Sequence, residues 1–250
     1  MGNISIKLRN VDLYYSSLSL QRSSLKATVL SLWKKRERLP DVHALKDITL
    51  DISAGERVAL LGRNGAGKST FLKMLAGLYP IRNGEREVNG SIRSLLELSL
   101  GFESEATGRE NILYRGLMLG LSPKAVRAQA DEIVEFAELG EFIDYPIKSY
   151  SAGMLVRLAF AITTTLQGDI LLLDEILGAG DFAFMQKAQQ RVMSLVEQAR
   201  IVVFATHDWG AAQSFCTRGL VFEKGRVIFD GAISEAIEAY KISLEKQQDA

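Results

Sequence analysis

The sequence predicts an α/β fold in which a largely parallel β-sheet is flanked by helices. Short apolar runs, among them Val58–Leu61 and Ile170–Leu173, alternate with segments of helical periodicity. This βα alternation is typical of parallel sheets. A glycine-rich loop stands between one of these runs and a helical segment. Residues 97–166 are predicted as consecutive helices that interrupt the alternation, so we expect them to form an inserted helical subdomain.

The individual elements follow from periodicity and from turn and capping residues. Residues 4–15 alternate apolar and polar side chains, which predicts one or two strands. Pro123 lies at the expected first turn of a helix. The polar tail 242–250 is expected to be frayed. The other expected strands are 49–52, 57–61, 170–174, 201–205 and 220–222, and the expected helices are 69–76, 109–119, 123–138, 155–166, 182–199 and 209–216.

The composition excludes several classes of protein. The 250 residues contain 30 basic and 30 acidic side chains, and this zero net charge argues against a nucleic-acid partner. Hydrophobic residues make up 47%, which is enough for a sizeable core, and Cys216 is the only cysteine, which excludes an internal disulfide. No run approaches the roughly 18 apolar residues of a membrane span. We therefore expect one cytoplasmic domain over residues 1–250, without a signal peptide.

The segment Gly62–Ser69 fits the phosphate-loop pattern G-x-x-x-x-G-K-[ST] at every position. Glycines let successive backbone N–H groups point at phosphate oxygens, and the start of the following helix adds a partial positive charge. Lys68 can reach the β- and γ-phosphates, and the Ser69 hydroxyl can ligate Mg²⁺. An ordinary glycine-rich turn is the alternative. The residues expected to hold the nucleotide phosphates are Gly62, Asn64, Gly65, Ala66, Gly67, Lys68, Ser69 and Thr70.

Two carboxylates end the apolar run that begins at Ile170. Asp174 suits a Mg²⁺ ligand, and Glu175 is placed to orient or deprotonate an attacking water. Together with the phosphate loop, this pair predicts a phosphate-loop NTPase, with kinases and GTPases still open.

Ser151 and Gly153 lie at the start of a predicted helix and offer a second anion site. One nucleotide does not need two such sites in one chain. A symmetric head-to-tail dimer does, because each chain offers its second site to the other's nucleotide. The segment Tyr150–Ala161, YSAGMLVRLAFA, resembles the signature of ABC ATPases and the helix after it. The usual motif has two glycines and a glutamine after the serine, where this chain has Ala152, Gly153 and Met154. A capped helix start without further role is the alternative.

The resemblance to ABC ATPases covers about residues 1–240 except 16–40. It implies a phosphate-loop NTPase core of ABC type, formed by 1–96 and 167–241, with an N-terminal antiparallel β subdomain. His207 is similar to the switch histidine that contacts the γ-phosphate. The loop Gly178–Asp181 is similar to the loop that crosses the dimer, and only Asp181 is carried over.

Two further site residues are implied by the resemblance alone. In this family an aromatic residue stacks on adenine, and it stands four positions after an aliphatic residue of an N-terminal strand. Counting from Val11 indicates Tyr15, with Tyr14 as the alternative. The usual glutamine after the phosphate-loop helix is absent, and Glu97 stands at the matching place. Glu97 is expected near Mg²⁺ and at the contact with the membrane partner.

At several positions the chain departs from the usual ABC motifs and resembles the ATPases that export O-antigen, capsule or teichoic-acid polymers. These positions are Glu97, Ala152, the loop Gly178–Asp181 and the segment Thr107–Ile112. This likeness implies ATP and Mg²⁺ as cofactors. It implies a homodimer that works with two copies of a separate transmembrane permease, peripheral to the cytoplasmic face of the inner membrane. Some such ATPases carry a C-terminal carbohydrate-binding domain, and none is expected here. A different ABC transporter, and a soluble ABC ATPase of DNA repair or translation, are the alternatives.

Residues 16–40 lie outside what the core fold requires. They contain six basic side chains and one acid, a local charge of +5, and Leu25, Val29, Leu32 and Trp33 recur at helical spacing. A basic amphipathic helix with a tryptophan suits a membrane interface or a lipid-linked anionic substrate. A solvated loop with a helix on the protein's own surface fits the composition equally well.

If this segment contacts the membrane or the substrate, replacing its six basic residues by glutamine should reduce polymer export at least tenfold, because each basic residue near an anionic surface contributes about 1 kcal/mol of attraction. The ATPase activity of the isolated chain should stay unchanged. Export is measured in cells and hydrolysis with purified protein. Loss of both activities together would contradict a role in membrane or substrate contact.

Overall fold

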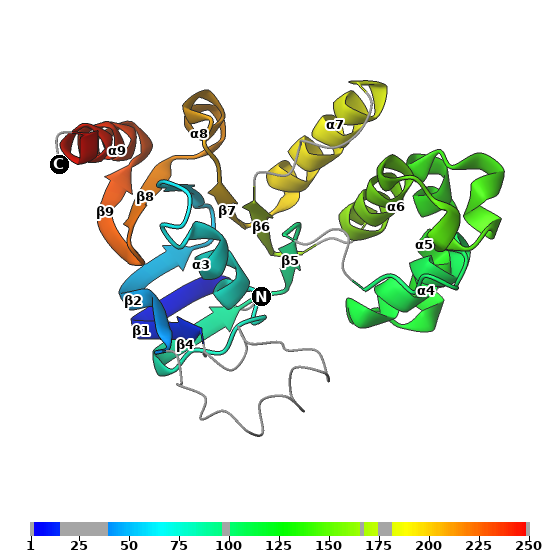
Figure 1. The fold of residues 1–250 in the computed structure, drawn as a ribbon, viewed down its shortest axis with the longest axis horizontal. Helices are drawn as coiled ribbons and strands as arrows, with labels where there is room; N and C mark the ends of the chain where they lie inside the picture. Colours follow the sequence, from blue (N-terminus) through cyan, green and yellow to red (C-terminus); the bar gives the residue numbers. More distant parts are fainter. Residues whose placement is uncertain (1–2, 16–39, 97–100, 166–167, 175–181, 249–250) are drawn as a thin grey trace, which may run out of the picture. The chain divides into compact units, whose positions relative to one another are not determined.

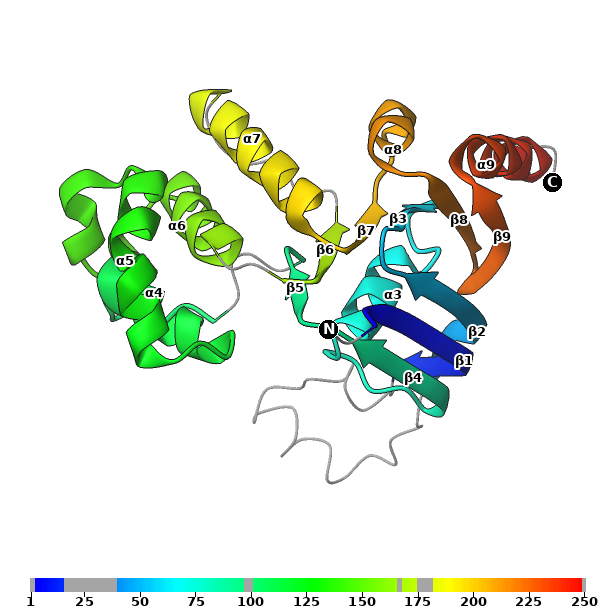
Figure 2. The same cartoon turned by 180° about the vertical axis from the view of Figure 1, so that it is seen from behind.

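The computed structural model describes residues 3–15, 40–96, 101–165, 168–174 and 182–248. The chain divides into two compact units, one made of Met1–Asn89 with Ala205–Ala250 and the other of Gly90–Phe204. Each unit has its own strands and helices (Figure 1, Figure 2). No helix in these described ranges is long and apolar enough to cross a membrane.

The first unit contains an antiparallel sheet in the order β2-β1-β4, which confirms the expected N-terminal β subdomain. Its strands are β1 (Ser5–Tyr15), β2 (Val42–Ser53) and β4 (Asn83–Asn89). Ile6 pairs with Ile52 on one side and with Val88 on the other. The alternating apolar residues of β1 are buried, and this burial explains the periodicity in the sequence.

The first unit also holds the strands that lead to the phosphate loop. β3 (Arg57–Leu61) pairs in parallel with β8 (Arg218–Glu223), and β8 pairs antiparallel with β9 (Arg226–Ala232). Its helices are α3 (Lys68–Leu75), α8 (Trp209–Phe215) and α9 (Ile233–Gln248). β3 is almost wholly buried, as expected for a parallel strand with an apolar run.

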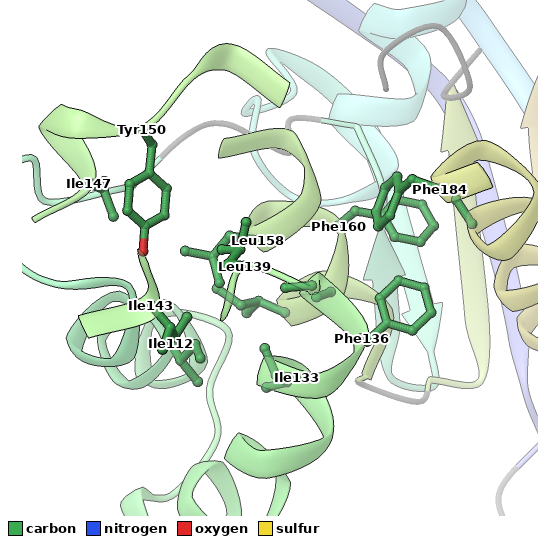
Figure 3. Close-up of a cluster of buried hydrophobic side chains, with 14 of the residues drawn as sticks. Ile112, Ile133, Phe136, Leu139, Ile143, Ile147, Tyr150, Leu158, Phe160 and Phe184 are labelled. Atoms are coloured by element: carbon green, nitrogen blue, oxygen red, sulfur yellow. The ribbon is translucent and has the colours of Figure 1, made fainter. Parts of the chain in front are cut away.

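The second unit combines three short strands with a group of helices. β5 (Ile92–Ser94), β6 (Ile170–Asp174) and β7 (Ile201–Ala205) lie side by side in that order. The helices are α4 (Gly108–Met118), α5 (Pro123–Ala137), η2 (Gly140–Asp144), η3 (Ile147–Ser149), α6 (Ala152–Thr165) and α7 (Phe182–Gln198). A cluster of apolar side chains forms the core of the helical part (Figure 3). Within it, Phe136, Phe160 and Phe184 pack with ring centres 5.9 Å apart.

The helix starts agree with their sequence signals. Thr107 caps α4 in a capping box, with its side chain accepting from the Glu110 N–H and the Glu110 carboxylate accepting from the Thr107 N–H. Ser122 caps α5, and Pro123 occupies the first turn as predicted.

Several elements differ from the sequence-based expectation. β4, β5, β9 and α9 were not predicted, because β4 is polar, β5 has three residues and β9 has one exposed face. α9 continues to Gln248, into the tail 242–250 that is expected to fray. Buried Ala236, Ile237 and Tyr240 hold this helix on the unit. The described part of 97–166 lies in the second unit, where Phe184 of α7 packs into the helical core.

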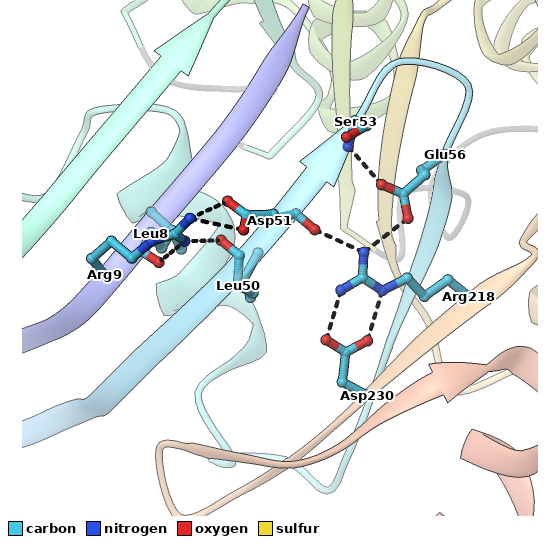
Figure 4. Close-up of polar contacts among 8 residues, drawn as sticks. All are labelled: Leu8, Arg9, Leu50, Asp51, Ser53, Glu56, Arg218 and Asp230. Atoms are coloured by element: carbon cyan, nitrogen blue, oxygen red, sulfur yellow. Dashed lines mark hydrogen bonds and ion pairs between the residues drawn. The ribbon is translucent and has the colours of Figure 1, made fainter.

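Arg218 joins three segments of the first unit through charged hydrogen bonds (Figure 4). Its guanidinium donates two bonds of 2.6 Å to the Asp230 carboxylate. A third nitrogen donates at 2.8 Å to both Glu56 and the Asp51 carbonyl. The hydrogen bond to Asp230 raises the pKa of Arg218, so the guanidinium stays charged. These bonds connect β8, β9 and the turn between β2 and β3.

Arg218→Ala should lower the free energy of unfolding by about 1–2 kcal/mol, because it leaves two part-buried carboxylates without their shared partner. Arg9→Ala is the matched control. Arg9 pairs with Asp51 at 2.8 Å, but both side chains are about half exposed. Urea unfolding should show a clearly larger loss for Arg218→Ala. Equal losses for the two variants would contradict the role of the network.

Candidate functional site

The phosphate-loop residues occupy the turn between β3 and α3, as the motif predicts. Gly62, Gly65 and Gly67 have φ of 148°, 79° and 113°. A Cβ at Gly62 would lie 2.5 Å from the carbonyl oxygen of Phe222 on β8, so a larger residue cannot fit there. The Gly67 carbonyl accepts the Phe71 N–H at 2.8 Å and starts the helix. The conformation of the loop backbone is therefore restricted at its start by β8 and at its end by α3.

Lys68 lies inside this loop with its side chain buried. Its ammonium donates to the carbonyl of Gly62, and to that of Arg63 at 3.2 Å. The charge is thus held at the helix start, where the loop N–H groups and the helix partial charge also favour an anion. Ser69, next along the chain, is exposed. This arrangement can bind the phosphates of a nucleotide.

The two candidate tyrosines have different surroundings. The Tyr15 hydroxyl lies 2.7 Å from the Thr70 hydroxyl on α3, and its ring meets Tyr79 edge-on at 5.5 Å. Tyr14 instead stacks on His43, with ring centres 4.1 Å apart. The structure therefore brings Tyr15, and not Tyr14, into contact with the phosphate-loop helix.

Gly225 supports the phosphate loop from the other side, and sequence reasoning missed it. Its N–H donates to the Ala66 carbonyl at 2.9 Å, and its own carbonyl accepts from the Lys46 N–H at 2.8 Å. Its φ is +82°, and a Cβ there would collide with the carbonyl oxygen of Ala44. A Lys-Gly pair between two apolar runs is a hairpin-turn signal that could have indicated this position.

His207 lies in the turn between β7 and α8, with hydrogen bonds fixing the backbone on both sides. The buried Thr206 hydroxyl accepts from the Asp208 N–H at 3.0 Å. The Asp208 carboxylate caps α8 by accepting from the Gly210 N–H at 2.8 Å and the Ala211 N–H at 3.1 Å. The His207 side chain itself is exposed. His207 is therefore an exposed side chain on a hydrogen-bonded turn, where a ligand can reach it.

In the second unit, Ser151 and Gly153 lie at the start of α6 and are exposed. The Ser151 hydroxyl accepts from the Met154 N–H at 3.2 Å, so it caps the helix as expected. Both residues line an open hollow together with Met154, Arg157 and residues 138–142. The turn is therefore an ordered, accessible helix start.

Tyr150 anchors this helix start from behind. It is buried, and its hydroxyl donates to the Phe142 carbonyl at 2.6 Å. Burial raises the pKa of Tyr150, which keeps it a neutral donor. A Cβ at Gly108 would collide with the Tyr150 hydroxyl, which explains a glycine in the Thr107–Ile112 segment.

The remaining predicted site residues are partly outside the described ranges. Asp174 ends β6 in a half-buried position, as predicted. Glu97, Glu175 and the loop Gly178–Asp181 lie outside the described residues, as does the basic segment 16–39.

Comparison with known proteins decides the family. The family model described as ABC transporter matches residues 45–178, more than half of the chain. The chain belongs to the ABC transporter family. It is 37% identical over 232 residues to an O-antigen export system ATP-binding protein of Yersinia enterocolitica, covering 88% of this chain and 97% of that one. It is 43% identical over 211 residues to such a protein of Myxococcus xanthus, covering 84% of this chain and 48% of that relative.

A solved structure supports the fold of this ABC ATPase. The dimeric ATP-binding cassette MJ0796, bound to ADP and phosphate, superposes with a TM-score of 0.67. The match covers 91% of this chain and 98% of that one at 24% identity, which is evidence for the fold alone. Family and fold together make the chain a nucleotide-binding ATPase, as the motifs predicted.

Gly225→Ala should weaken ATP binding by this ABC ATPase by about tenfold, because a side chain at this left-handed position strains the turn and displaces Ala66. Gly55→Ala is the matched control: Gly55 also has positive φ, +93°, but a Cβ there would meet nothing. Titration with a fluorescent ATP analogue measures both affinities. Equal affinities would contradict the supporting role of Gly225.

Proposed function

We propose that this chain is the ATP-hydrolysing subunit of an exporter that moves a lipid-linked polysaccharide of the O-antigen type across the cytoplasmic membrane. The observation that carries the proposal is the match to the Yersinia enterocolitica O-antigen export protein over 97% of that relative's length. Two copies of the chain would pair and act beneath two copies of a separate permease, on the cytoplasmic face of the inner membrane.

ATP binding is assigned to the first unit. Lys68 and the backbone N–H groups of the phosphate loop would hold the phosphates, since both lie at the start of α3. Tyr15 would stack on adenine, because its hydroxyl already contacts Thr70 beside the loop. Aromatic stacking on a base contributes about 1–3 kcal/mol in other proteins and does not need a hydrogen-bond pattern.

The side-chain types of the predicted metal ligands suit a Mg²⁺ ion. The Ser69 hydroxyl and the Asp174 carboxylate are the oxygen ligands that this ion prefers. Glu97 would add a third oxygen ligand, as the family resemblance implies. When bound, Mg²⁺ would neutralise negative charge on the phosphates.

Hydrolysis would depend mainly on positioning and charge stabilisation. Glu175 would orient and polarise the attacking water, and His207 would hold the γ-phosphate end. The capped turn around His207 supports this role because its hydrogen bonds order the backbone that carries the imidazole. Ser151 and Gly153 of the partner copy would complete the site. Both residues are exposed at an ordered helix start, as a contact across a dimer requires.

Coupling to export would follow from the closing of the dimer. Binding of ATP between the two copies pulls them together, and hydrolysis with release separates them. The two movements would alternate the permease between its inward and outward forms. The zero net charge of the chain leaves no basis for a nucleic-acid partner. Residues 16–40 would contribute the lipid-facing or substrate-facing charge.

The purified Glu175→Gln variant should form an ATP-dependent dimer, because it binds ATP but hydrolyses it slowly. Adding Ser151→Arg should abolish the dimer, since a bulky charge would block the γ-phosphate contact from the partner. Ser194→Arg, on the exposed surface of α7, is the matched control and should leave the dimer intact. Size-exclusion chromatography with and without ATP measures both. A dimer that survives Ser151→Arg would contradict the shared site.

A further inference from the structure

Two aromatic residues connect the turn of His207 to the C-terminal helix. Trp209 is the first residue of α8, two positions after His207, and it meets Tyr240 of α9 edge-on with ring centres 6.3 Å apart. The ammonium of Lys241 lies 5.4 Å from the centre of the Trp209 ring. Both views of the fold show α8 and α9 side by side (Figure 1, Figure 2). The aromatic contact therefore joins segments about 30 residues apart.

The helix that carries this tyrosine also packs beside the strand that leads to the phosphate loop. Burial raises the pKa of Tyr240, and the positive charge of Arg63 lowers it. The Arg63 carbonyl accepts from both Lys68 and the Ala66 N–H, at 3.2 and 3.1 Å. α9 packs in addition on β3, the strand that runs directly into this loop. One helix thus packs against α8, which follows His207, and against β3, which precedes the phosphate loop.

Because α8 is short, its orientation depends on the contact between Trp209 and Tyr240. The helix has seven residues, and helices of this length are not stable through their own hydrogen bonds. Asp208 caps its start, but a cap does not determine the direction in which the helix leaves the turn. That direction is set by packing, and Ala212 and Trp209 supply the inward-facing contacts. A change at Trp209 would therefore move the turn that carries His207.

We propose that Trp209 and Tyr240 are positioning residues for ATP hydrolysis, which make the location of His207 depend on the docked C-terminal helix. The proposal rests on the proposed role of His207 at the γ-phosphate. This role requires no contact between either aromatic residue and the nucleotide. Their effect reaches the chemistry only through His207, so they should influence turnover more than ATP binding.

The test measures steady-state hydrolysis by single and double variants of the full chain. Trp209→Ala should lower kcat about tenfold, since a misplaced catalytic group loses much of its contribution, while the affinity for ATP changes less than about twofold. Tyr240→Leu, which keeps the apolar volume, should act in the same direction. Tyr240→Phe, which keeps the ring, should retain wild-type turnover. Ile242→Ala, on the exposed side of the same helix, is the matched control.

The double variant His207→Ala/Trp209→Ala separates positioning from general loss of structure. If Trp209 acts through His207, the double variant should be no slower than His207→Ala alone. Multiplied losses would overturn the proposal, and so would a Tyr240→Phe variant as slow as Tyr240→Leu. A His207→Ala variant with full activity would instead contradict the proposed function of His207 itself. Circular dichroism and thermal unfolding of each variant verify that the first unit remains folded.

Discussion

The close approach of β3 to β8 where the phosphate loop begins is the constraint on which the rest of the first unit depends. Gly62 meets the Phe222 carbonyl with no room for a side chain, and the Phe222 ring packs on Phe71 of α3 at 5.1 Å. The strand, the loop and the helix therefore share one point of contact. A shift of one residue in strand register would turn every side chain of β3 to the other face. The pairing of β3 with β8 therefore fixes the point at which the phosphate loop leaves the sheet, and with it the direction of the loop N–H groups.

The elements around the loop are short, and their neighbours hold them in place. α3 has eight residues and α8 has seven, so neither would be stable alone. Backbone hydrogen bonds of Gly225 to the phosphate loop and packing of α9 on its neighbours supply the stabilisation that the short helices lack. Arg218 then ties the far ends of the same strands together through Asp230 and Glu56. The proposed ATP site is thus supported by residues that no nucleotide needs to touch.

The helical part of the second unit has its own core, built around stacked and edge-on phenylalanines. This core allows Ser151 to be exposed and still ordered, because Tyr150 is fixed behind it by a buried hydrogen bond. An exposed but rigid helix start is the property that a contact with a second copy would require, since little conformational freedom is lost when the contact forms.

The sequence by itself determined the strands Arg57–Leu61, Ile170–Asp174 and Ile201–Ala205, the phosphate loop and the membership of the ABC family. Local patterns sufficed there because apolar runs, glycines and helix caps act over a few residues. Only the tertiary structure showed that Tyr15 contacts Thr70 while Tyr14 stacks on His43. It alone placed Gly225 under the loop and Tyr240 beside Trp209, and it showed α9 as a helix through its polar end. These features arise from packing between residues far apart in the chain, and no local pattern records which surfaces meet.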